Sequence, residues 1–308
     1  MRPSINFRGH ERVEIIVTPL LKTSILLLSA KRKMLRGMQE NLKTIVMGSS
    51  HGDYGFDPDY CELSFNLCCR SQDLKHSFYL YKHVTTVAPH LKNLVLFYSI
   101  FSPGNRMENS PGEKDICPAI NELFELGLDY QDEHLATLSN NISGHLANFE
   151  FDIDGHAGFF PTTEKFFYPE DYGAVQRANE HLKLNADSEA HEFLWDTLTL
   201  AKASGHNVYI VIPPVRRDYK EATGQDFNSL FKDLISILQS FNALYLDFKV
   251  NLINGFDDED FKDEHFGDFD HLLPTGKGAE ILTRKINSVI NDAGCRACWQ
   301  PARHPWFR

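Results

Sequence analysis

The sequence predicts an α/β protein built on a parallel sheet. Short apolar runs that read as strands alternate with stretches in which apolar residues recur at helical spacing. The strand-like runs cover residues 44–47, 61–69, 91–101 and 207–215, and the clearest helical stretches cover 72–87 and 191–204. Strands separated by helices are typical of parallel sheets with helices packed on their faces.

The first predicted strand is the run Thr-Ile-Val-Met at residues 44–47, which is apolar and rich in β-branched residues. Gly48, Ser49 and Ser50 follow where such a strand would turn toward a helix. A serine at this position presents its hydroxyl at the carboxyl edge of the sheet, where open α/β folds bind ligands. If Ser50 begins the helix, backbone N–H groups of the first turn can also face an anion there.

The later half of the chain continues the pattern. Gly205 suits the end of the helix at 191–204, and the strand at 207–215 comes next. Residues 227–241 have amphipathic helical spacing, and residues 243–248 predict another strand. A final helix is expected over residues 279–290, after a loop broken by proline and glycine.

Between these halves, residues 102–187 interrupt the strand–helix pattern. Loops of that length in a compact domain are usually functional or disordered, and the aromatic content here favours order. We therefore expect a lid or a substrate platform. The aromatic residues could line a glycan groove or simply pack the insertion against the sheet: Phe159, Phe160, Phe166, Phe167 and Tyr168.

Composition excludes some classes of function. The chain has 308 residues, 42% of them hydrophobic, which suits one α/β core with an insertion. Its net charge of −11 argues against nucleic-acid binding, because phosphates repel an acidic chain that lacks a concentrated basic face.

Residues 1–40 are predicted to be an N-terminal extension. The basic cluster at 31–36 is expected to be a solvated helix end; an interfacial segment is the alternative, since apolar residues precede it. Glu14 and Lys22 interrupt the apolar stretch, so a transmembrane span is not expected. The segment also lacks the pattern of a signal peptide, which favours a cytoplasmic protein.

The six cysteines show no regular disulfide framework, in keeping with that compartment. Cys295 and Cys298, with His304 nearby, could be half of a zinc site. A structural site normally needs four ligands, however, so we expect residues 293–308 to be a poorly packed tail without a metal.

The residues that carry chemistry are far apart in the sequence. Ser50 alone would be a weak nucleophile, because a serine needs an adjacent base and the base needs a group that fixes its tautomer. Asp268 and His271 are three residues apart, just before the predicted final helix. The carboxylate can reach one imidazole nitrogen while the other nitrogen faces Ser50.

A serine after the first strand and Asp-x-x-His before the last helix resemble the SGNH superfamily of hydrolases, also called GDSL-like. The resemblance covers roughly residues 41–292 and implies a three-layer α/β/α flavodoxin-like sandwich. It also implies that Ser50 is the nucleophile, His271 the general base and Asp268 its orienting partner.

The resemblance is weaker where that family places its oxyanion hole. Cys69, or its neighbour Cys68, occupies the region of the family's glycine, and Asn105 is the candidate for its asparagine, with Ser102 competing. Two further residues are candidates for the pocket, namely His51, which follows Ser50, and Arg216, which would lie on the same rim and could contact an anionic group.

The sequence therefore predicts a serine esterase or O-acyltransferase that acts on an acylated carbohydrate or cell-envelope glycan, without a cofactor. The substrate class comes from the breadth of the family and the aromatic insertion. One alternative is a non-catalytic flavodoxin-like binding protein with a degenerate site. The other is a metal-dependent hydrolase that uses the acidic run at 257–270 and nearby histidines. The oligomeric state stays open.

Overall fold

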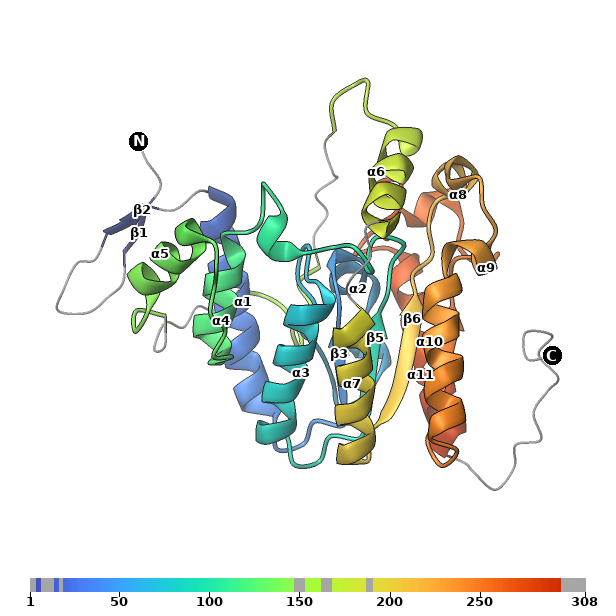
Figure 1. Ribbon diagram of the computed structural model, residues 1–308, viewed down its shortest axis with the longest axis horizontal. Helices are drawn as coiled ribbons and strands as arrows, with labels where there is room; N and C mark the ends of the chain where they lie inside the picture. Colours follow the sequence, from blue (N-terminus) through green and yellow to red (C-terminus); the bar gives the residue numbers. More distant parts are fainter. Residues whose placement is uncertain are drawn as a thin grey trace.

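The computed structural model describes residues 4–6, 14–16, 19–146, 153–161, 168–186 and 191–294 (Figure 1). Its centre is a five-stranded parallel sheet in the order β4-β3-β5-β6-β7. The strands are β3 (Thr44–Met47), β4 (Ser64–Asn66), β5 (Asn93–Phe97), β6 (Asn207–Ile212) and β7 (Val250–Asn254). Counted along the chain this is the flavodoxin-like order 2-1-3-4-5. The predicted fold class is confirmed.

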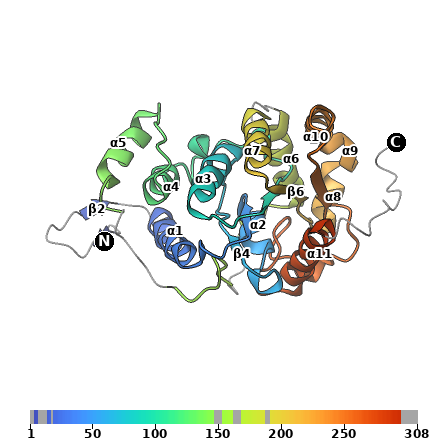
Figure 2. The same cartoon turned by 90° about the horizontal axis from the view of Figure 1, so that it is seen from below.

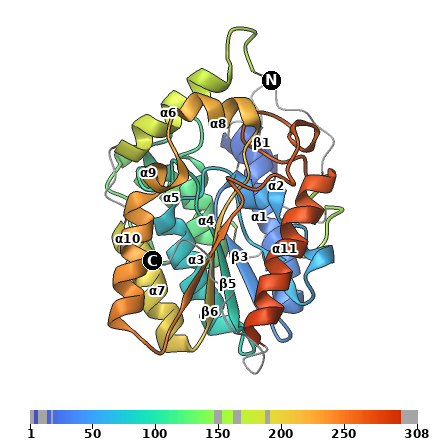
Figure 3. The ribbon, with the colours of Figure 1, turned by 90° about the vertical axis from the view of Figure 1, so that its right-hand side faces the viewer.

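Helices cover both faces of the sheet and make it the middle of three layers (Figures 2 and 3). On one face lie α3 (Leu74–Val87), α7 (His191–Ser204) and α10 (Lys232–Leu244). On the other lie α2 (Ser50–Gly55) and α11 (Lys277–Gly294), which contact each other. The shorter helices are α8 (Arg217–Thr223) and α9 (Phe227–Leu230), with 3-10 turns at Pro58–Tyr60, Met107–Asn109 and Asp263–His265.

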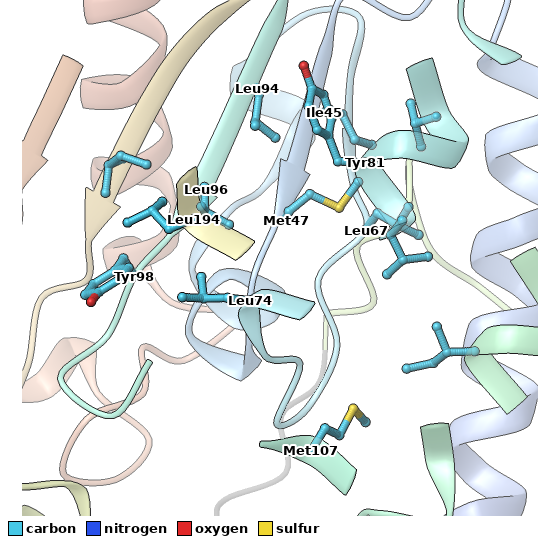
Figure 4. Close-up of a cluster of buried hydrophobic side chains, with 14 of the residues drawn as sticks. Ile45, Met47, Leu67, Leu74, Tyr81, Leu94, Leu96, Tyr98, Met107 and Leu194 are labelled. Carbon is cyan, nitrogen blue, oxygen red and sulfur yellow. The ribbon is translucent and has the colours of Figure 1, made fainter. Parts of the chain in front are cut away.

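Alternation along the strands builds the two halves of the core. In β3, Ile45 and Met47 pack toward α3, whereas Val46 points to the opposite face, where it meets Leu282 of α11 in the same cluster. Figure 4 shows the first of these clusters, with Ile45 and Met47 beside Leu94. Successive side chains of a strand point to opposite faces, and each fully buried aliphatic side chain contributes roughly 1.5–3 kcal/mol.

The last strand lies later in the sequence than predicted. The strand expected at 243–248 is wrong, because α10 continues to Leu244 and β7 begins at Val250. Leu246, in the middle of the predicted strand, is 91% exposed. The run at 250–254 pairs with β6 instead, and its side chains join both halves of the core: Val250 and Leu252 one half, Ile253 the other.

The N-terminal segment contains a long helix, α1 (Pro19–Met38), which packs into the main core beside β4. The expectation that the basic cluster is a solvated helix end is wrong for Lys31 and Arg32, which are only 2% and 3% exposed. Lys31 donates hydrogen bonds to the carboxylate of Asp53 and to the Cys68 carbonyl. None of the described helices is long and apolar enough to cross a membrane. A small antiparallel pair, β1 (Ser4–Asn6) and β2 (Glu14–Ile16), precedes α1.

The described residues of the insertion at 102–187 include three α-helices. These are α4 (Ile116–Phe124), which packs on α1, α5 (Glu133–Ile142), which packs on α4, and α6 (Ala174–Ala186), which packs on α8. Figure 3 shows α6 and α8 together beyond the carboxyl ends of the strands. Of the predicted aromatic set, Phe159 is buried, whereas Phe166 and Phe167 lie outside the described residues, as do Cys295, Cys298 and His304.

Candidate active site

The site lies at the carboxyl ends of the strands, where β3 gives way to α2. The strand order reverses on either side of β3, and this is the position at which doubly wound sheets bind ligands. Gly48 makes the turn with φ +138°, and a Cβ there would lie 2.7 Å from Cβ of Phe97. Only glycine therefore fits between β3 and β5, and the tight turn places Ser50 at the first position of α2.

Ser50, His271 and Asp268 form one hydrogen-bonded chain. The Ser50 hydroxyl lies 2.7 Å from Nε2 of His271, and Nδ1 of the same ring lies 2.8 Å from Oδ2 of Asp268. An ionised carboxylate only accepts hydrogen bonds, so Nδ1 carries the proton and Nε2 of the neutral ring accepts from the serine. The structure thus brings together the three residues that the sequence analysis paired across 221 positions.

The Asp268 carboxylate is held on both oxygens. Oδ1 accepts from the backbone N–H groups of Asp270, at 2.9 Å, and His271, at 2.7 Å. Oδ2 accepts a further hydrogen bond from the Tyr168 hydroxyl at 2.8 Å. Burial would raise the pKa of Asp268, but the charge of His271 and its hydrogen bond outweigh burial and the pKa is lowered. The carboxylate is therefore ionised and fixed in place.

A second carboxylate, Asp270, lies beside the first and is 1% exposed. Its Oδ2 is 3.1 Å from Nε2 of His51, and its Oδ1 is 3.2 Å from Nε of Arg177. Nδ1 of His181 is 3.8 Å away and Nδ1 of His271 is 3.6 Å away. Asp270 is thus surrounded by nitrogen atoms from three separate segments of the chain.

His51 belongs to a second series of polar contacts, which joins Ser49, His51 and Asp270 beside the first. Its Nε2 faces Asp270 and its Nδ1 lies 3.3 Å from the hydroxyl of Ser49. The rings of His51 and His271 are stacked, with centroids 4.6 Å apart. His51 is only 4% exposed, so it packs behind His271 and supports that ring.

The two stacked imidazoles have opposite pKa shifts. Burial lowers the pKa of His271, but the charges of Asp270 and Asp268 outweigh burial and raise it overall. Burial, together with the charge of His271, lowers the pKa of His51. Burial likewise lowers the pKa of His181 to about 3. Of the three, His271 is the ring that gains a proton most readily.

The three candidate oxyanion donors differ in how far their hydrogen-bonding groups are already used. The N–H of Cys69 donates to the Gly48 carbonyl at 3.2 Å, and the Asn105 amide donates to the Ser71 carbonyl at 2.9 Å. The Ser102 hydroxyl accepts from the N–H of Ser99, and this bond does not use the O–H of Ser102. A role for Cys69 as an oxyanion donor therefore requires that its bond to Gly48 open. These roles stay predictions.

Arg216 lies on the rim, as its position after β6 predicts. Its guanidinium forms two hydrogen bonds to Asp218, at 2.7 and 2.6 Å, and lies over the ring of Phe269. Its backbone N–H donates to the Phe269 carbonyl, which ties it to the loop that carries Asp268 and Asp270. The charge of Arg216 is thus balanced by Asp218, and contact with an anionic substrate stays a prediction.

Only one group among the described residues has metal-ligand atoms close together: those of His51, Asp270 and His271 lie within 4.8 Å of one another. Both nitrogens of His271 are already hydrogen-bonded, to Ser50 and Asp268. The Arg177 guanidinium contacts both oxygens of Asp270. A divalent cation would have to displace that guanidinium, so this donor set does not fit a metal.

Sequence reasoning missed three residues of the cluster: Asp270, Arg177 and His181. Asp270 was visible inside Asp-Phe-Asp-His, but the Asp-x-x-His spacing directs attention to Asp268 alone. Arg177 and His181 are four residues apart on α6 and therefore share one helix face. Tyr168 was predicted as an aromatic residue that lines a groove or packs the insertion, and the structure adds a hydrogen bond from its hydroxyl to Asp268.

Comparisons with known proteins add little. No family model matches the chain, and no curated protein matches it. One similar solved structure is described as "The structure of a putative platelet activating factor from Streptococcus pneumonia.". It is 13% identical, with 88% of this chain and 97% of that chain covered and a TM-score of 0.41. A score this low carries no inference about the chemistry of this site.

Proposed function

We propose that the protein is a serine-dependent ester hydrolase or O-acyltransferase of the SGNH type. The observation that carries the proposal is the continuous hydrogen-bonded chain from Ser50 through His271 to Asp268. A serine, a base within about 2.6–3.2 Å and a group that orients the base are the components of an activated nucleophile. The flavodoxin-like strand order is consistent with that family.

The geometry supports a two-step reaction. The Ser50 oxygen attacks the ester carbonyl carbon while its proton passes to Nε2 of His271. The tetrahedral intermediate collapses, the same proton passes to the leaving alcohol, and the acyl group stays on Ser50. A water molecule or a sugar hydroxyl then attacks the acyl carbon and gives its proton to Nε2. When this second tetrahedral intermediate collapses, the acyl group leaves with the acceptor and the proton passes from Nε2 to the Ser50 oxygen, which restores both residues. Asp268 stays ionised and holds the imidazole in place throughout.

The oxyanion would be held by backbone N–H groups around Ser50. Ser50 is the first residue of α2, and the first N–H groups of a helix have no acceptor within the helix. Cys69 and Asn105 are the further candidates. The Cys69 N–H contacts Gly48, which belongs to the turn before Ser50, and the Asn105 amide contacts Ser71 in the loop after β4. Removing one such donor typically costs about 10²–10³ in rate.

We assign the substrate to acylated carbohydrates because of the aromatic surface next to Asp268. Tyr168 and Tyr172 are stacked, with centroids 4.9 Å apart, and Phe269 lies 5.5 Å from Tyr168. All three residues are partly exposed. Partly exposed aromatic faces with polar edges suit the stacking of sugar rings.

The test is turnover of p-nitrophenyl acetate together with labelling by a fluorophosphonate probe. The wild type should hydrolyse the ester and label on Ser50, and Ser50→Ala should lose both. Ser204→Ala, at the exposed end of α7, is the matched control and should behave as the wild type. Hydrolysis that survives in Ser50→Ala would exclude the mechanism.

The alternative is a non-catalytic binding protein on the same fold. The hydrogen bond between the Cys69 N–H and the Gly48 carbonyl favours it, because that donor is taken. Absence of both turnover and labelling in the wild type would support this alternative. Activity that is lost with EDTA and restored by a divalent metal would instead support a metal-dependent hydrolase.

A further inference from the structure

We propose that Asp270 and Arg177 are positioning residues of this site, and that α6 of the insertion completes it by bringing Arg177 onto Asp270. The inference rests on the proposed function, which assigns His271 as the base. It adds a second carboxylate and a helix that the Ser50, His271 and Asp268 chain does not include.

Asp270 is placed to hold the base from behind. Its carboxylate is 3.6 Å from Nδ1 of His271 and 3.1 Å from Nε2 of His51, whose ring stacks on His271. Asp268 holds the His271 ring at its Nδ1 edge. His51, held in turn by Asp270, stacks on one face of that ring. A ring held on its edge and on one face keeps Nε2 directed at Ser50.

Arg177 is what makes a second buried carboxylate tolerable. An unpaired buried charge is costly, and two neighbouring carboxylates repel each other. Nε and Nη2 of Arg177 lie 3.2 and 3.4 Å from the two oxygens of Asp270, which is a bidentate arrangement. His181 lies one turn further along α6. Its Nδ1 and the Tyr219 hydroxyl are hydrogen-bonded at 2.7 Å, which anchors α6 to α8.

This arrangement makes the insertion part of the site. Arg177 and His181 come from α6, and Tyr168, which contacts Asp268, comes from the segment just before it. Both carboxylates of the loop at 268–271 are therefore held by residues of the insertion. Helix α6 lies with α8 beyond the carboxyl ends of the strands (Figure 3).

The charged groups around His271 shift its pKa in directions that can be measured. The negative charges of Asp270 and Asp268 raise the pKa of His271 against burial, and the positive charge of Arg177 lowers it. The groups that face or influence this ring come from the loop, from α2 and from the insertion: Asp268, Asp270, Ser50, His51, Tyr54, Tyr168, Arg177 and His181.

The experiment compares Asp270→Asn with Arg177→Gln. Asp270→Asn should lower the pKa of His271 by about one unit or more, since a neighbouring charge typically shifts a pKa by about 1–3 units. Arg177→Gln should shift it in the opposite direction. The kcat of p-nitrophenyl acetate hydrolysis should fall by about 10² in Asp270→Asn with a smaller change in KM, because a misplaced base costs about that factor.

The readout is twofold, namely the acid limb of kcat/KM against pH and the titration of the His271 ring by NMR. Arg177→Lys should recover part of the wild-type profile because it keeps the charge. Arg217→Gln is the matched control, because that arginine is 80% exposed and pairs with Glu221 outside the site.

The NMR titration separates the two proposals, because it needs no turnover. An inactive wild type whose His271 pKa still shifts in opposite directions in the two variants supports the inference and defeats the proposed function. Unchanged pH profiles and His271 titrations in both variants would overturn the inference. If Asp270→Asn does not fold, Arg177→Gln alone decides, since the Arg177 side chain is 21% exposed.

Discussion

The two histidines of the site have the same kinds of neighbour and opposite properties. Both are 4% exposed, each contacts a serine and an aspartate, and their rings are stacked. His271 has a raised pKa because the charges of Asp270 and Asp268 outweigh its burial, whereas His51 has a lowered pKa because burial and the charge of His271 outweigh Asp270 alone. The comparison teaches that the number of carboxylates near each ring, rather than its burial, decides which imidazole can act as a base.

The strongest way to break this comparison is to remove each ring in turn. His271→Ala should lower kcat by about 10⁵–10⁶, the loss expected when the base of a serine triad is deleted. His51→Ala should cost only about 10², because His51 supports the base without exchanging a proton with substrate. Steady-state hydrolysis of p-nitrophenyl acetate measures both.

Thermal unfolding of the two variants serves as the control for folding. Equal losses of kcat in folded His271→Ala and His51→Ala would mean that the rings share the proton transfer.

A smaller effect is expected from the hydrogen bond between Tyr168 of the insertion and Asp268. Tyr168→Phe removes one hydrogen bond to a charged group, which is worth about 1.5–3 kcal/mol; at the lower end of that range kcat should fall by about tenfold. Tyr172→Phe is the matched control, because its hydroxyl donates to Glu180 and not to Asp268. If both variants lose activity equally, the aromatic surface itself matters and the bond to Asp268 does not.

The smallest expected effect concerns acid stability. Burial would raise the pKa of Asp270, but His271, the hydrogen bond from His51 and Arg177 hold it well below its ordinary value. A carboxyl with a lowered pKa in the folded state stabilises the fold above its unfolded pKa of about 3.9, and this contribution is lost as the pH falls from there through the folded value.

Urea unfolding at about pH 6 and about pH 3 should therefore give a larger drop in the free energy of unfolding for the wild type than for Asp270→Asn. The pH range follows from that lowered pKa. An identical drop in both proteins would mean that Asp270 titrates normally in the fold.

The parts of the fold that the sequence predicted are those that depend on local pattern. The strand at 44–47 and the helix at 191–204 agree with the structure, because a buried strand is continuously apolar and a helix shows its periodicity. The strand at 243–248 was misplaced because its alternation looks like a strand's, and only tertiary pairing with β6 selects 250–254.

The residues of the site likewise divide into those that local sequence pattern reveals and those that only tertiary packing reveals. Ser50, Asp268 and His271 could be found because each lies in a short motif next to a regular element. Arg177 could not, because nothing in the sequence around it states that α6 will reach Asp270. Likewise, the charges at 31–36 looked solvated, and only packing against β4 reveals that Lys31 is buried.

The burial of α1 has a consequence for synthesis on the ribosome. This helix leaves the ribosome before the groups that it contacts: Lys31 donates to the carbonyl of Cys68, and Arg32 donates to the carbonyl of Leu123. Until α4 has also emerged, the leucines of α1 have no complete surface to cover them. We expect this helix to be the stretch of nascent chain that binds molecular chaperones most strongly.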